Sequence, residues 1–193
     1  MVVSFMGPYE YISSMQRKKL GPNGEYLTRL LHPSDIRATQ AMFERASDYF
    51  EVATGAPPAR DEATRAFVAG PPSKSVDDKR IVGIFDRHNE LIGILDALVD
   101  FPENGDWTMG MLLLDPEHRG AGLGTVALEA YEDWAVGRGA KRFHTAVVSR
   151  HQPGIRFLEN RGYRQQRKIQ NYDAGARRAT VVFFAKDPGA GTR

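Results

Sequence analysis

The sequence of 193 residues contains no cysteine. That absence excludes a disulfide scaffold, a thiolate metal site and a cysteine nucleophile, and it is compatible with a reducing compartment. No run approaches the ~20 apolar residues that a membrane-spanning helix needs. The first six residues lack the basic start and the long apolar core of a secretory signal. We therefore expect a soluble, cytoplasmic protein with no membrane partner.

The formal net charge is only +2, too small to imply a polyanionic partner by itself. The C-terminal third is nevertheless basic, and three interpretations of it stay open: a solvated surface, contact with a phosphate-bearing cofactor, or a nucleic-acid face. Aromatic residues of the kind used for base stacking are not interleaved there, so nucleic acid is not the expected partner. The basic residues are Arg161, Arg164, Arg167, Lys168, Arg177 and Arg178.

The sequence also lacks a metal-ligand spacing pattern. Four of the histidines, His32, His88, His118 and His144, are not spaced as metal ligands, and no metal site is predicted. Hydrophobic residues at 41% and charged residues at 26% are ordinary globular values. We expect one domain over residues 25–187, preceded by an N-terminal extension over residues 1–24 and followed by a flexible tail over residues 188–193.

Apolar periodicity predicts an α/β fold with a mixed, mostly antiparallel central sheet flanked by helices. One helix is expected from Asp35 to Ala53, ended by Gly55, and a long amphipathic helix is expected to begin within the glycine cluster near residue 123. Further helices are predicted over residues 61–69 and 154–161. Strands are predicted over residues 25–31, 81–85, 91–99, 108–114, 143–148, 168–172 and 180–185.

The glycine cluster contains the residues with the clearest chemistry. A buried strand ends at Leu114, and the turn Arg119-Gly120-Ala121-Gly122-Leu123-Gly124-Thr125 leads into the long helix. The first N–H groups of a helix have no intrahelical partner and lie at the positive end of its dipole, so they form an anion site. Glycine lets a diphosphate approach the main chain and lets the turn adopt positive φ.

Two rival phosphate motifs do not match this spacing. A dinucleotide fingerprint needs Gly-x-Gly-x-x-Gly, whereas these glycines alternate. A nucleotide-hydrolase loop ends in Gly-Lys-Ser/Thr, whereas Gly124 is followed directly by Thr125. A glycine-rich helix start with no ligand is the remaining alternative.

The strand ending Leu-Asp-Pro followed by Arg-Gly-x-Gly-x-Gly resembles the acetyl-CoA motif of the Gcn5-related N-acetyltransferase (GNAT) family. The segment Ile155–Tyr163 is similar to that family's helix and Gly-Phe/Tyr turn, and the resemblance covers roughly residues 80–172. It implies a GNAT-like fold and acetyl-CoA as acyl donor, without a metal. It also implies that the strands ending at Leu114 and Val148 splay apart to admit the thioester.

The resemblance further implies a set of cofactor-binding residues. The main chain of Leu112 and Leu114 is expected to pair with the pantetheine amides, and the amides from Gly120 to Thr125 are expected to hold the diphosphate. His151 stands where the family often has an asparagine against the cofactor, and Phe157 is expected beside pantetheine or in the core. The predicted set is Leu112, Leu113, Leu114, Arg119, Gly120, Ala121, Gly122, Leu123, Gly124, Thr125, His151 and Phe157.

Two catalytic groups frequent in the family are missing: Thr108 stands where a glutamate base is common, and Leu158 where a tyrosine acid is common. Proton removal is therefore assigned to Asp96, which interrupts an apolar strand at a place where an unpaired carboxylate would be costly. A solvent-facing or paired structural role for Asp96 stays open. Asp100 shares its strand face by alternation and is a second candidate near the substrate.

Tyr49 and Phe50, at the end of the first long helix, are predicted to line the acceptor entrance, with core packing as the alternative. The expected function is transfer of an acetyl group to a primary amine of a small molecule. The alternatives are a macromolecular amine (a protein N-terminus, a lysine or an aminoacyl-tRNA) and a non-catalytic acyl-CoA sensor. A homodimer is left open.

Overall fold

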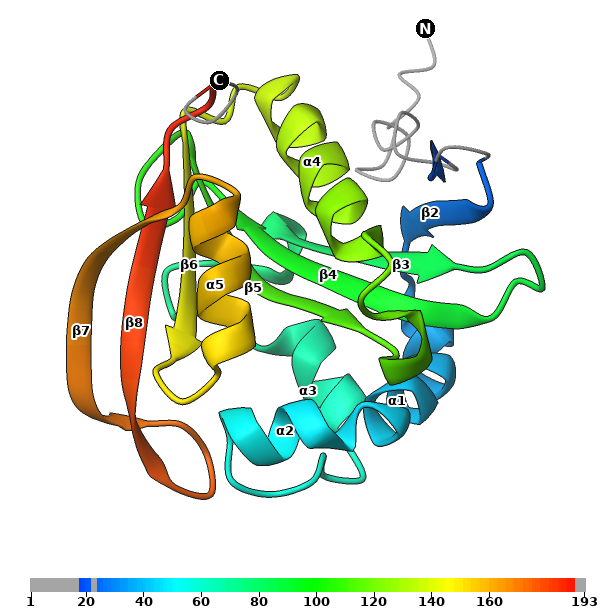
Figure 1. Cartoon of the computed structure of the whole chain (residues 1–193), viewed down its shortest axis with the longest axis horizontal. Helices are drawn as coiled ribbons and strands as arrows, with labels where there is room; N and C mark the ends of the chain where they lie inside the picture. Colours follow the sequence, from blue (N-terminus) through cyan, green and yellow to red (C-terminus); the bar gives the residue numbers. More distant parts are fainter. Residues whose placement is uncertain (1–17, 22–23, 190–193) are drawn as a thin grey trace, which may run out of the picture.

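A computed structural model describes residues 18–21 and 24–189 of the chain. It consists of one eight-stranded sheet with helices on both faces (Figure 1), in the order β1-β2-β3-β4-β5-β6-β8-β7. All neighbouring strands are antiparallel except β5 and β6. The strands are β1 (Lys18–Leu20), β2 (Tyr26–Leu30), β3 (Lys79–Phe85), β4 (Leu91–Val99), β5 (Asp106–Leu114), β6 (Arg142–Val148), β7 (Arg164–Asp173) and β8 (Arg178–Lys186).

The helices form two layers, one on each face of the sheet (Figure 1). The layer containing α4 and α5 packs on one core cluster, and the layer containing α1, α2 and α3 packs on another. The helices are η2 (Pro33–Asp35), α1 (Ile36–Arg45), α2 (Ser47–Ala53), α3 (Glu62–Val68), η3 (Val76–Asp78), η4 (Pro116–His118), α4 (Leu123–Val136) and α5 (Gln152–Asn160). The predicted mixed, mostly antiparallel α/β fold is confirmed.

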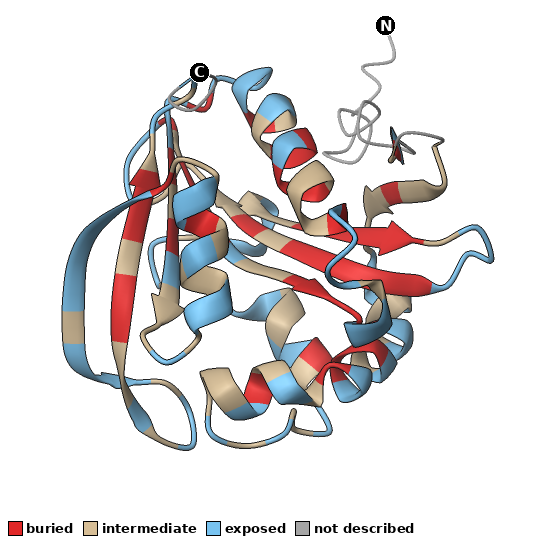
Figure 2. Cartoon of the chain, in the orientation of Figure 1, coloured by how far each residue is buried: buried red, intermediate tan, exposed pale blue. Residues whose placement is uncertain are grey.

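Alternation along the strands separates the two cores, because successive side chains of a strand point to opposite faces. On β4, Leu95 and Ala97 pack in the cluster with α4, whereas Ile94 packs beneath α1 and α3. Because helices cover both faces of the sheet at its centre, β4 is mostly buried, whereas the edge strand β7 is almost wholly exposed (Figure 2). The sheet therefore has one buried centre and one long exposed edge at β7.

Two differences from the sequence-based expectation concern the first half of the chain. The helix expected from Asp35 to Ala53 is divided into α1 and α2 at Ala46, whose φ of −97° and ψ of 30° break the helical path. A short strand, β1, pairs with β2 inside the segment that was predicted to be an extension. The rest of that predicted extension, residues 1–17 and 22–23, lies outside the described residues, as do residues 190–193 of the predicted tail.

Candidate active site

The glycine cluster forms the start of α4 as predicted from its spacing. Gly120 and Gly122 have φ of 83° and 88°, the left-handed region that residues with a Cβ avoid. A Cβ at either position would meet no atom within 4 Å, so the main chain there borders open space. The helix's own hydrogen bonds begin with Thr125 N donating to Gly122 O at 3.0 Å. The preceding amides are therefore not used inside the helix and are available for an anion.

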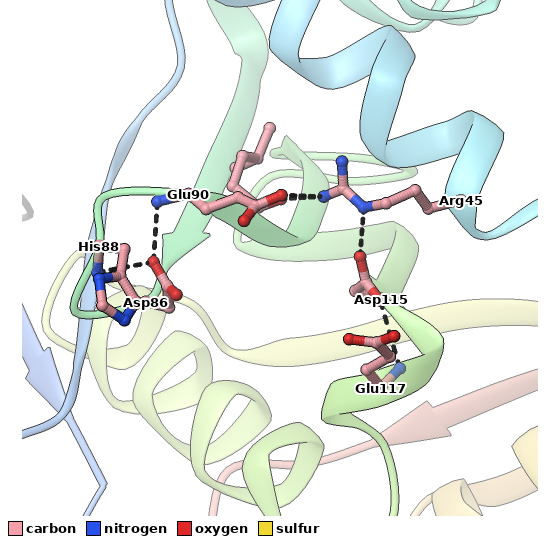
Figure 3. Close-up of polar contacts among 7 residues, drawn as sticks. Arg45, Asp86, His88, Glu90, Asp115 and Glu117 are labelled. Carbon is pink, nitrogen blue, oxygen red and sulfur yellow. Dashed lines mark hydrogen bonds and ion pairs between the residues drawn. The ribbon is translucent and has the colours of Figure 1, made fainter.

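Arg45 from α1 fixes the strand end that leads into this glycine turn (Figure 3). Its Nε donates to Asp115 Oδ2 at 2.5 Å, and its Nη2 donates to Leu91 O at 2.7 Å. Asp115 is only 6% exposed, and its Oδ1 accepts from Glu117 N at 3.2 Å to begin η4. Burial is the largest single influence and opposes ionisation of Asp115, but the hydrogen bonds from Arg45 and Glu117 N and the charge of Arg45 together outweigh it, so the pKa of Asp115 is lowered.

Arg119 makes a second link between the turn and the first helical layer. Its Nε donates to Leu114 O at 2.8 Å, and its guanidinium forms two hydrogen bonds to Asp48 of α2, at 2.5 and 3.0 Å. The hydrogen bond from Arg119 lowers the pKa of Asp48. Because Arg45 and Asp48 lie on either side of the break at Ala46, the α1–α2 corner holds the turn at two points.

Beside the glycine turn, the parallel strands β5 and β6 separate. Their pairing covers Asp106–Met109 on β5 and Arg142–Thr145 on β6 and ends there. On the other side of β5 the register with β4 shifts, because Asp96 is opposite Met111 and Ala97 is opposite Met109. Gly110 is thus the extra residue of a β-bulge, a feature that bends a strand locally. A slot opens between the two strands from this point.

The slot belongs to a cleft of about 960 Å³. Its walls come from α2, β5, the glycine turn, β6, the start of α5 and the β7–β8 hairpin. Asp115 N donates to Ile92 O on β4, so by alternation the N–H and C=O groups of Leu112 and Leu114 point away from β4, toward the slot. Consistent with this, Leu114 O accepts from Arg119.

Most of the predicted cofactor residues line this cleft, and two do not. Ala121 is absent from the lining, and Leu123 is 3% exposed because its side chain packs in the core beneath α4. Any contribution of these two residues would come from the main chain. The predicted residues in the cleft wall are Leu112, Leu113, Leu114, Arg119, Gly120, Gly122, Gly124, Thr125, His151 and Phe157.

The predicted acceptor residues separate more sharply. Tyr49 lines the cleft, with its ring edge-on to His151 at a centroid distance of 6.0 Å. Phe50 is 3% exposed and packs against Phe43 at 5.0 Å, so it lies in the core and not in the cleft wall. Neighbouring residues of a helix point about 100° apart, which is why only one of the pair can face the cleft. Asp100 also lies outside the lining, in the turn after β4, where its Oδ1 accepts from Gly105 N at 2.7 Å.

Asp96 lies directly behind the cleft wall. Its Oδ2 accepts from Lys79 Nζ at 2.8 Å, and Lys79 also donates to Ala69 O. The other carboxylate oxygen, Oδ1, is buried without a hydrogen-bond partner. A Cβ built on the cleft residue Gly110 would lie 3.5 Å from Asp96 Oδ2. Burial raises the pKa of Asp96, and the positive charge of Lys79 opposes that rise.

His151 is the N-cap residue of α5 and lines the cleft. Burial lowers its pKa, and the nearby Arg119 lowers it further, so the ring is neutral at pH 7. A neutral imidazole offers one donor and one acceptor to a ligand in the cleft.

Three features of the structure have no local sequence signal. Tyr172 and Phe183 of the β7–β8 hairpin line the cleft, and Asp48 is the partner of Arg119. His144 and Asp106, on adjacent strands, are joined at 2.9 Å, but neither lines the cleft, in keeping with the absence of a site signal in the spacing of the histidines. Only the tertiary fold brings these pairs together. Among the described residues, no group of three or more His, Cys, Asp or Glu is placed to hold a metal ion.

The site thus combines a three-layer α/β fold, a slot between separating parallel strands and, at the mouth of the slot, a glycine turn with free main-chain amides. The model of the acetyltransferase (GNAT) family matches residues 39–163, more than half of the chain. The chain belongs to that family. No curated protein sequence matches it significantly.

Several solved structures share this fold. An acetyltransferase from Thermus thermophilus has 24% identity and a TM-score of 0.64, over 83% of this chain and 96% of that one. Spermidine N-acetyltransferase from Vibrio cholerae, in complex with CoA and spermine, has 15% identity and a TM-score of 0.67, over 87% and 98%.

A third similar structure is an acetyltransferase from Salmonella typhimurium that modifies the N-terminal serine of ribosomal protein L7/L12. It has 16% identity and a TM-score of 0.68, over 84% of this chain and 95% of that one. At these identities the comparisons establish the shared fold, and the acceptor must be inferred from this chain's own cleft. No helix among the described residues is long and apolar enough to cross a membrane.

Proposed function

We propose that this protein transfers the acetyl group of acetyl-CoA to a primary amine of a small molecule, by direct attack of the amine on the thioester. The observation that carries this proposal is the glycine turn at the mouth of the slot: Gly120 and Gly122 have positive φ and open space where a Cβ would stand. The amides at the start of α4 would bind the diphosphate, and the slot-facing main chain of Leu112 and Leu114 would pair with pantetheine as an added strand.

The residues around the slot fit the requirements of direct transfer. The reaction needs a neutral amine held close to the thioester, a proton acceptor, and a donor for the developing oxyanion. A main-chain N–H of β5 that points toward the slot and is not paired with pantetheine would be the donor. Asp96, with its raised pKa and unpartnered Oδ1, would accept the proton directly or through one water.

The size of the acceptor is limited by a contact across the cleft. Arg177 of the β7–β8 hairpin donates from Nη2 to Glu51 O at 2.9 Å and also to Val52 O. This joins the hairpin to the end of α2, and both elements line the cleft. Because this contact restricts access to the cleft, it favours a small-molecule acceptor over a protein segment.

A macromolecular acceptor is the second candidate, favoured by the exposed strand β7, which carries Arg164, Arg167 and Lys168. The two functions are separated by measuring CoA release with a broad panel of small amines, peptides and aminoacyl-tRNA. We expect turnover with small amines. Turnover with peptide or RNA alone would support the second candidate, and binding of acetyl-CoA without release of CoA with any acceptor would indicate a sensor.

Tyr49→Ala tests the acceptor side of the cleft. Because Tyr49 faces the cleft beside His151, we expect its loss to raise the acceptor KM about tenfold, the scale of one aromatic contact. The KM for acetyl-CoA should change less than about twofold. Phe50→Leu is the control, because Phe50 lies in the core: it should lower the thermal unfolding temperature and leave both KM values unchanged. Equal effects of Tyr49→Ala on both substrates would remove Tyr49 from the acceptor site.

A further inference from the structure

The part of the cleft that the β7–β8 hairpin and α2 line contains aromatic side chains. Phe184 and Val182 of β8 pack in the core with α4, so the alternating Phe183 points to the opposite face, beneath α2. Tyr172 of β7 contacts Phe183 edge-on, with a centroid distance of 6.4 Å. Tyr49 of α2 lines the same cleft from the helical side.

The Phe183 ring is held in place, and the Tyr172 ring is open to solvent. The guanidinium of Arg167 lies over the Phe183 ring at 4.6 Å, a cation–π arrangement that fixes the ring. Tyr172 is 45% exposed, one of the few large apolar side chains that the described part of the chain leaves open to solvent. An exposed aromatic ring at the mouth of a cleft is suited to contact a ligand.

The charges of the cleft do not suit a polycation. Among the described residues that line it, Asp48 alone carries a carboxylate, and Arg119 already holds both of its oxygens. The other charged lining residue, Arg150, is basic. Behind the wall, Asp96 is neutralised by Lys79. A second ammonium group on the acceptor would therefore find no free counter-charge, and its desolvation would be uncompensated.

We propose that the acceptor is a monoamine carried on an aromatic or branched apolar body, which lies between Tyr49 on one side and Tyr172 with Phe183 on the other. This inference rests on the proposed acetyl transfer and names its substrate class. Two contacts between the β7–β8 hairpin and α2 would close the cleft behind that apolar body. Arg177 bonds to the end of α2, and Gly175 lies close to Thr54. Burial of one ring there would supply binding energy that a linear polyamine cannot gain.

The test is CoA release with 2-phenylethylamine, ethylamine and spermidine. We expect kcat/KM to be at least about tenfold higher for 2-phenylethylamine than for either of the others, the scale of one buried ring. In Tyr172→Ala, kcat/KM for 2-phenylethylamine should fall about tenfold and that for ethylamine less than about twofold. The ratio of variant to wild type cancels the different basicities of the amines. Tyr172→Phe should retain the preference for 2-phenylethylamine. Val136→Ala alters an exposed residue outside the cleft lining and should leave kcat/KM unchanged for both substrates.

Val52→Asp provides the converse test. Val52 lines the cleft from α2, and an aspartate there would offer a carboxylate to a second ammonium group of the acceptor. We expect this variant to gain activity with spermidine and to lose it with 2-phenylethylamine. A wild-type preference for spermidine, or equal losses for all amines in Tyr172→Ala, would overturn the proposed substrate class while leaving acetyl transfer intact. Failure of acetyl transfer itself would be seen differently, as no CoA release with any amine.

Discussion

Replacing Gly122 by valine is expected to weaken acetyl-CoA binding about 100-fold or more. The Cβ of this residue would point into open space in the cleft wall, where the diphosphate is proposed to lie. Branched methyl groups there would either displace the phosphates or separate them from the amides of α4, a loss on the order of 3 kcal/mol. Isothermal titration calorimetry with acetyl-CoA measures the effect.

Gly139→Val is the matched control. Gly139 has a φ of 90°, close to the 88° of Gly122, and a Cβ there also meets nothing within 4 Å. It follows the other end of α4 and is not part of the cleft wall. Both variants should lose similar stability, roughly 1–2 kcal/mol from the left-handed backbone, but only Gly122→Val should lose affinity. Equal affinities in the two variants would show that the glycine turn is not the phosphate site.

Asp96→Asn is expected to lower kcat about 10²-fold, the usual scale for loss of one general base. Acetyl-CoA affinity should stay near that of the wild type, because the glycine turn is untouched. A lysine-like acceptor with a pKa of about 10.4 is mostly protonated at neutral pH, so raising the pH should partly restore the rate by supplying free amine. Thermal unfolding must accompany the kinetics, since the change leaves Lys79 without its carboxylate partner.

Lys79→Met separates a catalytic from a structural role of Asp96. Burial raises the pKa of Asp96, and the charge of Lys79 lowers it, so removal of that charge should raise the pKa further. A base must be deprotonated to act, and the acidic limb of the kcat/KM profile should therefore move to higher pH in Lys79→Met. A normal kcat in folded Asp96→Asn at pH 7, or an unmoved acidic limb in active Lys79→Met, would retire Asp96 as the base.

The sequence was sufficient for the parts of the fold that depend on local patterns. β4 has the predicted bounds of 91–99, and α4 begins at Leu123, immediately after the glycine turn. Apolar periodicity and glycine spacing act over a few residues, so they survive in a single sequence. Membership of the GNAT family followed from the same short motif.

The parts that could not be predicted depend on contacts between distant residues. The break at Ala46 lies in a segment with continuous helical periodicity, so the sequence pattern does not predict it. Arg45 and Asp48, on either side of the break, form ion pairs with Asp115 and Arg119. Asp48 and Arg119 are 71 positions apart, and no local pattern records such a pair. The candidate site at the start of α4 is thus predictable from one short segment, whereas the ion pairs that hold this segment come from α1 and α2.

The cleft wall shows the same limit on a finer scale. The sequence alone did not distinguish the roles of the adjacent aromatic residues Tyr49 and Phe50. Because neighbouring residues of a helix point in different directions, Tyr49 lies in the cleft wall and Phe50 in the core. Tyr172 and Phe183 belong to strands whose basic neighbours were the more obvious feature. Their role on the cleft wall depends on the hairpin that Arg177 joins to α2.

The central claim, direct acetyl transfer to an amine, is tested most directly by following the acetyl group itself. Purified protein would be incubated with acetyl-CoA trideuterated in its acetyl group and with 2-phenylethylamine, and the products read by mass spectrometry. We predict an amine product that carries the labelled acetyl group, formed over many turnovers with one free CoA for each product, and formed far more slowly by Gly122→Val when acetyl-CoA is subsaturating. Bound acetyl-CoA that remains intact in the presence of every amine offered would contradict the account.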